Sequence, residues 1–287
     1  MEDLETDGLV NAPAFSVVVP VYNEETGLAE RCAALLDGLP PGAEVVFVCN
    51  GCTDRSEAIL RETVGARALI LLAPKGKAAA IRTGERHVTA FPRFYVDADV
   101  EIGGADLCRL AQRLSHGTRL VAPRLRLDLA GASRATRLLY RFAAQLPHWR
   151  QGAYHNVLGI TEDVRARWGE FPEVIADDTF IESQVVPGEK AIVPEVEAVV
   201  RPPRRLWPFI MVRTRWLQGE RELAARGFAI PRVAGQRAAI LRLIMRPGYL
   251  VGGMLYLFAN IAARLLAPWR PRRPDDWYHD ASARRGR

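Results

Sequence analysis

The sequence is poor in the residues that build disulfide frameworks and transition-metal centres. It has four cysteines, Cys32, Cys49, Cys52 and Cys108, and its five histidines show no ligand spacing. Four cysteines in a chain of 287 residues do not form the disulfide framework of a small secreted protein, so we expect reduced thiols. Zinc-finger spacing, an aromatic-rich RNA-binding pattern and a helix-turn-helix are also absent, which argues against a nucleic-acid partner.

A leader with a charged start, an apolar stretch and a small-residue cleavage site is missing as well. Residues 1–13 are acidic and polar instead, so we expect a flexible N-terminal tail on a cytoplasmic protein. With 49% apolar residues, the chain can bury a full core. Its length fits one large domain, or one domain with a substantial appendage.

The net charge of +6 hides a strong asymmetry along the chain. Residues 1–200 carry 21 Lys and Arg against 28 Asp and Glu, a net −7, while residues 201–287 carry 18 Arg against 5 Asp and Glu, a net +13. A basic segment of this kind suits anionic lipid or phosphate. We therefore expect the two parts of the chain to have different surroundings.

Short apolar runs rich in β-branched residues alternate with helical patterns in the N-terminal part of the chain. Strands are expected at 15–20, 45–49, 68–72 and 94–97, and helices at 28–39, 53–64 and 76–88. This alternation predicts an α/β fold with a mainly parallel sheet and helices on both faces. Farther along, helices are expected at 106–115, 132–146 and 161–168, and another begins at Asp177 and Asp178.

Two aspartates, Asp97 and Asp99, directly follow the last of the expected strands. In parallel sheets, ligands bind beyond the carboxyl ends of the strands. Divalent cations such as Mg²⁺ take oxygen ligands and leave other positions to substrate phosphates, so one or two aspartates suffice. The pair therefore indicates a metal site, although an isolated Asp-x-Asp also occurs by chance without a metal.

Four segments carry a resemblance to a known family: 20–24 (PVYNE), 50–54 (NGCTD), 76–84 (GKAAAIRTG) and 96–99 (VDAD). In this order and spacing they resemble the nucleotide-sugar domain of family 2 inverting glycosyltransferases, which have the GT-A fold. The similarity covers about residues 15–200. It implies a GT-A-like domain over residues 14–203, followed by a helical appendage.

The resemblance also implies roles for individual residues. Pro20, Tyr22 and Glu24 would border the nucleoside of a nucleotide-sugar donor. Lys77 would lie near the base or the phosphates, and Asp97 nearer the ribose. Asp99 would hold the Mg²⁺ or Mn²⁺ ion that bridges the diphosphate.

The turn at residues 49–54 departs from the family pattern. Family members commonly carry two aspartates where this chain has Cys49 and Asn50, and the first of them typically contacts uracil, so the donor base stays open. Asn50 and Asp54 remain expected donor-binding residues. Cys49 and Cys52 also form a Cys-x-x-Cys at the start of a helix, which in a thioredoxin-like protein is a redox site. A redox site leaves the other three segments unexplained.

An acidic pair, Asp177 and Asp178, supplies the expected catalytic residues. It resembles the family's acidic pair before a helix, in which the second acid is the general base, and this implies that Asp178 deprotonates the acceptor hydroxyl. The alternative is that Asp177 or Asp178 only caps the helix. Both roles are compatible with each other.

A basic and apolar segment over residues 204–270 follows the expected domain, and a basic tail covers 271–287. Its uncharged stretch, 247–263, spans about 26 Å as a helix and falls a little short of a ~30 Å hydrocarbon core. The arginines around it favour a helix lying in a membrane interface, so residues 232–270 are expected to contact the cytoplasmic face of a membrane. Packing of these helices on the catalytic domain is the alternative. A lipid-linked acceptor would follow from membrane attachment.

Two other functions remain open from the sequence. A nucleotidyltransferase on a related fold would carry a Gly-rich basic loop just after its first strand, and residues 20–24 contain none. A non-catalytic, membrane-bound relative could keep the acidic residues for structure alone.

Overall fold

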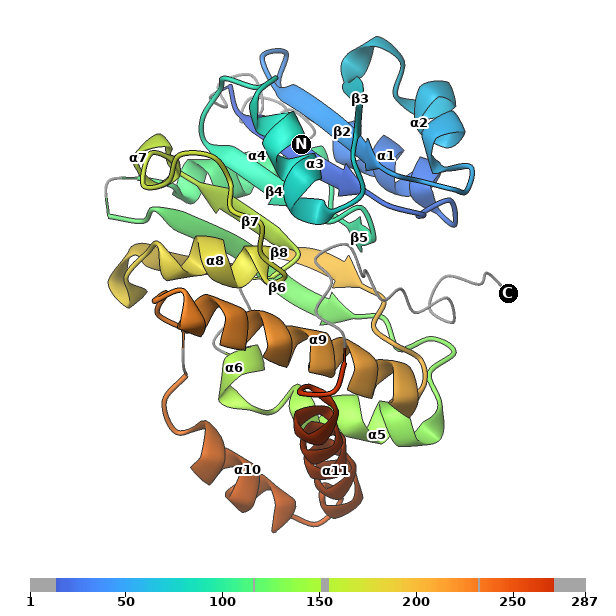
Figure 1. The fold of residues 1–287 in the computed structure, drawn as a ribbon, viewed down its shortest axis with the longest axis vertical. Helices are drawn as coiled ribbons and strands as arrows, with labels where there is room; N and C mark the ends of the chain where they lie inside the picture. The colour runs from blue at the N-terminus through green and yellow to red at the C-terminus, as the bar shows by residue number, and fades with distance from the viewer. Residues whose placement is uncertain (1–13, 116, 151–154, 232, 271–287) are drawn as a thin grey trace, which may run out of the picture. The chain divides into compact units, whose positions relative to one another are not determined.

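The computed structural model of the chain describes residues 14–115, 117–150, 155–231 and 233–270 (Figure 1). The expected tails over 1–13 and 271–287, and Arg232 in the expected membrane segment, lie outside these residues. The chain divides into two compact units. The first contains Met1–Arg126, Tyr154–Glu173 and Gln184–Val200, and the second contains Leu127–Ala153, Val174–Ser183 and Arg201–Arg287.

Within the described residues, the first unit is built on an eight-stranded sheet with the order β3-β2-β1-β4-β7-β6-β8-β5. The strands are β1 Ser16–Val21, β2 Glu44–Asn50, β3 Leu69–Ala73, β4 Arg93–Val96, β5 Val100–Glu101, β6 Leu120–Leu127, β7 Val157–Ile160 and β8 Lys190–Val200. Strands β3, β2, β1 and β4 run parallel, whereas β7 is antiparallel to both β4 and β6, and β5 is antiparallel to β8. The expected α/β class is confirmed, and its parallel part is the part that the sequence pattern predicts.

The parallel strands β1, β2 and β4 are buried almost throughout, which explains why they are rich in Val and Phe. The helices of this unit are α1 Leu28–Leu36, α2 Ser56–Val64, α3 Lys77–Glu85, α4 Gly104–Arg113 and α7 Glu162–Arg165, with short 3₁₀ turns at Gly65–Arg67 and Pro187–Glu189. Helix α3 packs on β1, β2 and β3. Its Gly84 lies so close to the sheet that a Cβ atom there would be 2.6 Å from Cγ1 of Val18.

Two expectations differ from the structure in the C-terminal half of this unit. The helix expected at 161–168 is only the short α7, Glu162–Arg165. Strands β5 to β8 are not among the expected strands. Strands β6 and β8 are only partly buried and mix charged with apolar residues, and β5 and β7 are only two and four residues long.

The second unit is helical. It contains α5 Arg134–Ala143, α6 Pro147–Arg150, α8 Asp177–Ser183, α9 Leu206–Ala225, α10 Gln236–Ile244 and α11 Leu250–Leu266. Helix α11 packs on α5 and α9, as the red, green and orange ribbons in Figure 1 show. It does so through small residues: Gly252, Gly253, Ala259 and Ala263 are buried. None of the described helices has both the length and the apolar composition needed to cross a bilayer.

Candidate active site

Polar residues from separate segments of the first unit meet beyond the carboxyl ends of the parallel strands. The side-chain amide of Asn50, at the end of β2, donates to the carbonyl of Val21 at the end of β1, at 2.8 Å. Lys77 begins α3, and its Nζ lies 2.6 Å from Oδ1 of Asp97, which follows β4. The structure thus brings together residues that are far apart in the sequence, at the edge where the parallel topology directs ligands.

Asp97 is held from both of its carboxylate oxygens. Lys77 pairs with Oδ1, and the Asn156 side chain donates to Oδ2 at 3.0 Å. The backbone N–H of Asp97 also donates to the carbonyl of Asn156, at 2.8 Å. Asn156 has a left-handed backbone, with φ of 66°, a conformation that asparagine tolerates better than most residues. These contacts fix Asp97 and offset its charge.

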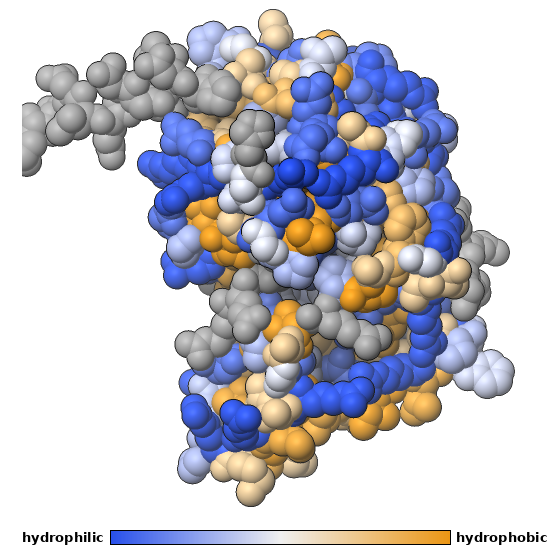
Figure 2. All heavy atoms as spheres, turned by 90° about the vertical axis from the view of Figure 1, so that its left-hand side faces the viewer, coloured by the Kyte–Doolittle hydropathy of each residue, from blue (hydrophilic) through white to orange (hydrophobic). Residues whose placement is uncertain are grey.

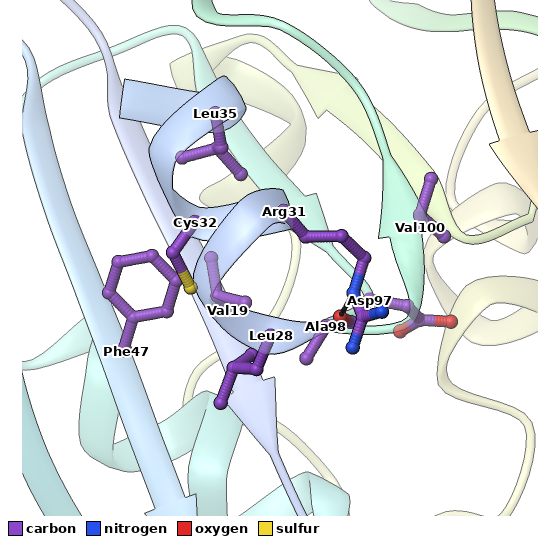
Figure 3. Close-up of a pocket in the computed structure, with 9 residues that line it drawn as sticks. All are labelled: Val19, Leu28, Arg31, Cys32, Leu35, Phe47, Asp97, Ala98 and Val100. Carbon is purple, nitrogen blue, oxygen red and sulfur yellow. Dashed lines mark hydrogen bonds between the residues drawn. The ribbon is translucent and has the colours of Figure 1, made fainter. Parts of the chain in front are cut away.

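Asp99 is different, although it is only two residues away. Its side chain is half-buried, and among the described residues it makes no hydrogen bond and no ion pair. The turn that carries it is anchored at the preceding residue, where Nε of Arg31 donates to the carbonyl of Ala98 at 2.6 Å (Figure 3). Asp99 therefore has a fixed backbone and a carboxylate that is available to a cation.

The expected nucleoside residues lie in and after β1. Pro20 is buried within the strand, and the half-buried Tyr22 has the Lys75 ammonium 5.5 Å from the centre of its ring. Glu24 is only 5% exposed. Its carboxylate faces Arg31 at 3.8 Å, and its backbone N–H donates to Ser56 Oγ at 2.7 Å.

The turn after β2 is tied to the neighbouring loops. Asn50 is 1% exposed and also accepts a hydrogen bond from the Gly76 amide, at 3.4 Å. Asp54 accepts from the backbone amides of Glu25 and Ser56, both at 3.0 Å. In this structure both side chains brace the loops of the site, and their expected contacts with a donor stay predictions.

Cys49 and Cys52 both lie in this turn, and the interaction between their thiols shifts the pKa of each in opposite directions. The hydrogen bond from Cys49 is the main reason that the pKa of Cys52 falls below its ordinary range, to about 7. The same contact, together with burial, raises the pKa of Cys49. Cys52 also donates to the carbonyl of Val21, at 3.3 Å. Cys52, which is half-buried, is therefore the thiol of the pair that ionises more readily.

The expected catalytic pair lies in the second unit, at the first turn of α8. Asp177 is buried and Asp178 is half-buried. Oδ1 of Asp178 accepts the backbone N–H of Thr179 at 2.6 Å. Acidic side chains in a first turn are also favoured by the positive end of the helix dipole. These contacts agree with a capping contribution and leave the catalytic role a prediction.

The residues near Asp99 fit a divalent cation whose other ligands come from substrate. No group of three or more His, Cys, Asp or Glu side chains in the described residues is placed to hold a metal ion by itself. Asp99 has no partner in the part of the chain that the structure describes, and it lies beside Asp97, whose charge Lys77 offsets. Such a pair suits a cation whose remaining ligands are phosphate oxygens, as in the Mg²⁺ sites of many nucleotide-binding proteins. We therefore assign Asp99 as the candidate ligand.

Sequence reasoning missed two residues of this site. Arg31 lies on the same face of α1 as Leu28 and Leu35, so its helical spacing alone places a charged residue on a buried face. That spacing is a usable signal. Asn156 carries no such signal, because its role comes from a left-handed backbone and from strand β7 pairing with β4.

A family model described as "Glycosyl transferase family 2" matches residues 16–158. The match covers the first four parallel strands and the candidate donor residues from Pro20 to Asp99. It ends two residues beyond Asn156, inside β7.

Curated relatives match a similar region. An undecaprenyl-phosphate 4-deoxy-4-formamido-L-arabinose transferase from Edwardsiella ictaluri is 34% identical over 114 residues, covering 37% of this chain and 35% of the relative. Its counterpart from Enterobacter sp. is 30% identical over 149 residues, covering 48% of this chain and 46% of the relative. The chain thus matches less than half the length of these relatives.

Solved structures extend the likeness to most of the chain. Mannosyltransferase PcManGT from Pyrobaculum calidifontis, in complex with GDP-Man and Mn²⁺, has a TM-score of 0.64 at 19% identity, covering 91% of this chain and 88% of that chain. Glucosyl-3-phosphoglycerate synthase from Mycobacterium tuberculosis, in complex with Mn²⁺ and UDP-glucose, has a TM-score of 0.54 at 20% identity, covering 79% and 84%. The expected GT-A fold is confirmed.

Proposed function

Because the chain belongs to glycosyl transferase family 2, we propose that it transfers a sugar from a nucleotide-sugar donor to an acceptor, with inversion and with the help of Mg²⁺ or Mn²⁺. One observation carries the proposal. Lys77 neutralises Asp97 at the carboxyl ends of the parallel strands, beside an Asp99 that has no partner among the described residues. This arrangement suits a nucleoside diphosphate, which brings negative charge and needs a cation.

The donor would lie over the loops that follow β1, β2 and β3. Tyr22 offers a partly exposed ring to the nucleoside, and Lys75 and Lys77 bring positive charge toward its phosphates. The buried Asn50 is already hydrogen-bonded to Val21 and Gly76, so other groups would have to recognise the base of the nucleotide. The proposed donor is therefore a nucleotide-sugar with no particular base assigned.

Asp99 would hold the cation, and the donor diphosphate would complete its coordination. When bound, the cation offsets the negative charge that develops on the leaving nucleoside diphosphate. Lys77 adds a fixed positive charge next to Asp97. The chain's own contribution is to keep these groups in place before the donor arrives.

Asp178 is the proposed general base for a hydroxyl acceptor. It accepts the hydroxyl proton as the acceptor oxygen attacks the anomeric carbon, and the bond from that carbon to the diphosphate breaks. The electron pair of that bond leaves with the nucleoside diphosphate. Attack from the opposite side gives inversion.

A lipid-linked acceptor is part of the proposal. The curated relatives are named as undecaprenyl-phosphate transferases, and a polyprenyl phosphate is therefore the first acceptor to test. Its phosphate oxygen is already anionic at neutral pH and has no proton to lose. A phosphate acceptor would need Asp178 much less than a hydroxyl acceptor does.

Helices α10 and α11 supply the proposed membrane surface, on the cytoplasmic face. Helix α11 buries most of its small residues and exposes most of its large apolar ones. The exposed large apolar residues of this surface are Leu241, Met245, Leu250, Val251, Met254, Leu257, Phe258, Ile261, Leu265 and Trp269. Figure 2 shows hydrophobic and hydrophilic residues side by side at the bottom of the view, where Figure 1 draws α10 and α11. We call these ten residues the apolar face.

The charge around the apolar face argues for anionic lipid as its occupant. Arg237, Arg242, Arg246 and Arg264 are exposed on the same two helices or just after them. A helix that combines an apolar face with arginines lies well at the boundary between headgroups and acyl chains. A lipid-linked acceptor would be presented at that boundary.

A donor screen tests the proposed function. A panel of nucleotide-sugars with Mn²⁺ should contain one that raises the melting temperature, because a ligand that binds only the folded state stabilises it. Hydrolysis or transfer of that donor should release nucleoside diphosphate. Release of pyrophosphate would indicate nucleotidyl transfer instead, and no binding or turnover at all would indicate a non-catalytic relative.

Replacing Asp178 with Asn tests the base and the acceptor class together. With a hydroxyl acceptor, Asp178→Asn should lower kcat by about a hundredfold or more, while donor binding is unchanged. With a polyprenyl phosphate acceptor, the loss should be much smaller. Normal turnover of a hydroxyl acceptor by the variant would exclude Asp178 as the base.

A further inference from the structure

Helix α1 has one charged residue on its buried face (Figure 3). Arg31 is 7% exposed and borders a small pocket with Leu28, Cys32 and Leu35 of the same helix. A guanidinium is expensive to bury unless its hydrogen-bonding groups are satisfied. The burial of Arg31 therefore depends on the carbonyl and carboxylate groups around its guanidinium.

The three guanidinium nitrogens reach two different loops. Nε donates to the carbonyl of Ala98 at 2.6 Å. The two terminal nitrogens donate to the carbonyls of Thr26, at 3.0 Å, and Glu24, at 3.3 Å. The Glu24 carboxylate balances the charge at 3.8 Å. Arg31 thus joins the loop after β1 to the turn after β4.

We propose that Arg31 is a positioning residue, which sets the Asp97–Asp99 turn against the loop after β1 and so aims Asp99 at the cation of the donor. The proposal rests on the proposed function for the identity of the cation site. Arg31 acts through the backbone of Ala98 and does not itself contact the donor.

The geometry of the turn explains why Asp99 depends on Arg31. Asp97 is fixed by Lys77 and Asn156, but Asp99 has no side-chain contact of its own among the described residues. The direction of its carboxylate is set by the backbone, and Arg31 bonds that backbone at Ala98. A planar guanidinium can bond several carbonyls at once, which the single ammonium of lysine cannot do in the same geometry.

Arg93 offers a matched control. It is also buried, at 5% exposure, and it donates to Ser16 Oγ at 3.1 Å and to the carbonyl of Val88 at 2.9 Å. It begins β4, at the end of the strand opposite to Asp97. Replacing either arginine with methionine removes a buried guanidinium, but only Arg31 bonds the metal-binding turn.

Two measurements on the full chain test the proposal. Calorimetry with GDP and UDP should show that Arg31→Met weakens Mn²⁺-dependent nucleotide binding by about 10- to 100-fold, and that Arg31→Lys recovers part of the loss. Arg93→Met should lower the melting temperature and leave Mn²⁺-dependent binding close to wild type. If Arg31→Met does not fold, Arg31→Lys and Arg31→Gln are compared with Arg93→Gln instead.

Hydrogen exchange separates this proposal from the proposed function. The backbone amides of residues 97–100 should exchange faster in the Arg31 variant than in the Arg93 variant, without any ligand present. Unchanged protection of this turn, or equal loss of Mn²⁺-dependent binding in both variants, would overturn the positioning role. If the wild type binds no nucleoside diphosphate, the proposed function fails, and the exchange result still decides whether Arg31 orders the turn.

Discussion

Asp97 and Asp99 are neighbours in sequence, yet the structure gives them different tasks. Asp97 is bonded to Lys77 and Asn156, whereas Asp99 is not bonded among the described residues. Asp99→Asn should weaken Mn²⁺-dependent donor binding by at least about tenfold, with little change in stability, because it removes a cation ligand and no internal contact. The measurement is calorimetric titration of nucleoside diphosphate with Mn²⁺ and again with a chelator.

Asp97→Asn provides the contrast. It leaves Lys77 without its charged partner at a site where both side chains are largely buried, and it should cost about 2 kcal/mol of the free energy of unfolding. Urea denaturation of both variants measures this. The assignment of roles would be reversed if Asp99→Asn were the destabilised variant and Asp97→Asn were not.

The lowered pKa of Cys52 predicts that chemical labelling of this thiol depends on pH near neutrality. The hydrogen bond from Cys49 lowers the pKa of Cys52 to about 7, so its thiolate form grows as pH rises through neutrality. Only the thiolate attacks an alkylating agent. Iodoacetamide should label Cys52 with a half-maximal rate near pH 7, against about 8.5 for an ordinary thiol, as measured by mass spectrometry of the peptide.

The other cysteines are internal controls for this labelling. Cys32 is buried, and burial raises its pKa to about 12, so it should stay unlabelled over the same pH range. Cys49→Ala removes the hydrogen-bond donor that lowers the pKa of Cys52 and should move the labelling of Cys52 toward higher pH. A half-maximal rate near 8.5 in the wild type would contradict the contact between the two thiols.

The sequence predicts which acidic and basic residues belong to the candidate site, but it does not predict which contacts they make. Asp97, Asp99 and Lys77 stand in short segments whose spacing is a family pattern, so they can be named without coordinates. That Lys77 bonds Asp97 depends on α3 packing across the sheet, which no local pattern encodes. Arg31 could have been found from its place on the apolar face of α1, but its target at Ala98 could not.

At the scale of elements, α3 controls where Lys77 lies. The helix approaches the sheet at Gly84, where a Cβ atom would be 2.6 Å from Val18 and 3.2 Å from Val46. Gly84→Ala should therefore push α3 away from β1 and β2, at a cost of about 1–3 kcal/mol. The shift also moves Lys77 relative to Asp97, so donor affinity should fall together with stability.

Gly188→Ala is the matched control for Gly84→Ala. A Cβ atom at Gly188 meets nothing within 4 Å, so this substitution should leave the denaturation midpoint nearly unchanged. Equal midpoints for the two variants would mean that α3 does not lie as close to the sheet as described.

The parallel half of the sheet could be predicted and the antiparallel half could not, for a physical reason. Strands β1, β2 and β4 are buried on both faces and appear as unbroken apolar runs. Strands β6 and β8 mix buried positions with partly and fully exposed ones and contain charged residues and proline. Their pairing joins segments far apart in sequence, and such contacts leave little local trace.

At the scale of the whole molecule, the two units are interleaved along the chain. Residues 127–153 and 174–183 group with the C-terminal helices, although they lie between segments of the first unit in sequence. That residues 14–203 form one domain, with a boundary near residue 203, stays a prediction. The second unit also has a core of its own, in which Leu139, Tyr140 and Ile210 pack against Ala259 and Ala263 of α11.

This core decides how membrane binding should be tested. Removing the chain beyond about residue 232 would take away α10 and α11 and uncover Leu139 and Phe142, which pack against them. A truncated chain would then expose new apolar surface and bind vesicles for the wrong reason. Substitutions on the apolar face of the full chain avoid this problem, because its side chains are exposed and do not belong to the packed core.

The double variant Met254→Gln and Phe258→Gln should therefore lose vesicle binding without losing stability. Both side chains are 58% exposed on α11, and burying each in a lipid interface is worth about 1.5 kcal/mol, or about tenfold in partitioning. The measurement is co-sedimentation with vesicles of neutral lipid and of neutral lipid mixed with anionic lipid. Binding of the wild type should require the anionic lipid and should weaken as salt screens the arginines.

Leu69 and Leu72 on β3 supply the control, because they are 52% and 61% exposed but belong to the first unit. Replacing both with Gln should leave vesicle binding as it is. If the α11 variant sediments with anionic vesicles as well as the wild type does, the apolar face does not contact lipid. If instead the wild type is a dimer by light scattering and only the α11 variant is a monomer, the face is covered by a second copy of the chain, and the membrane proposal is wrong.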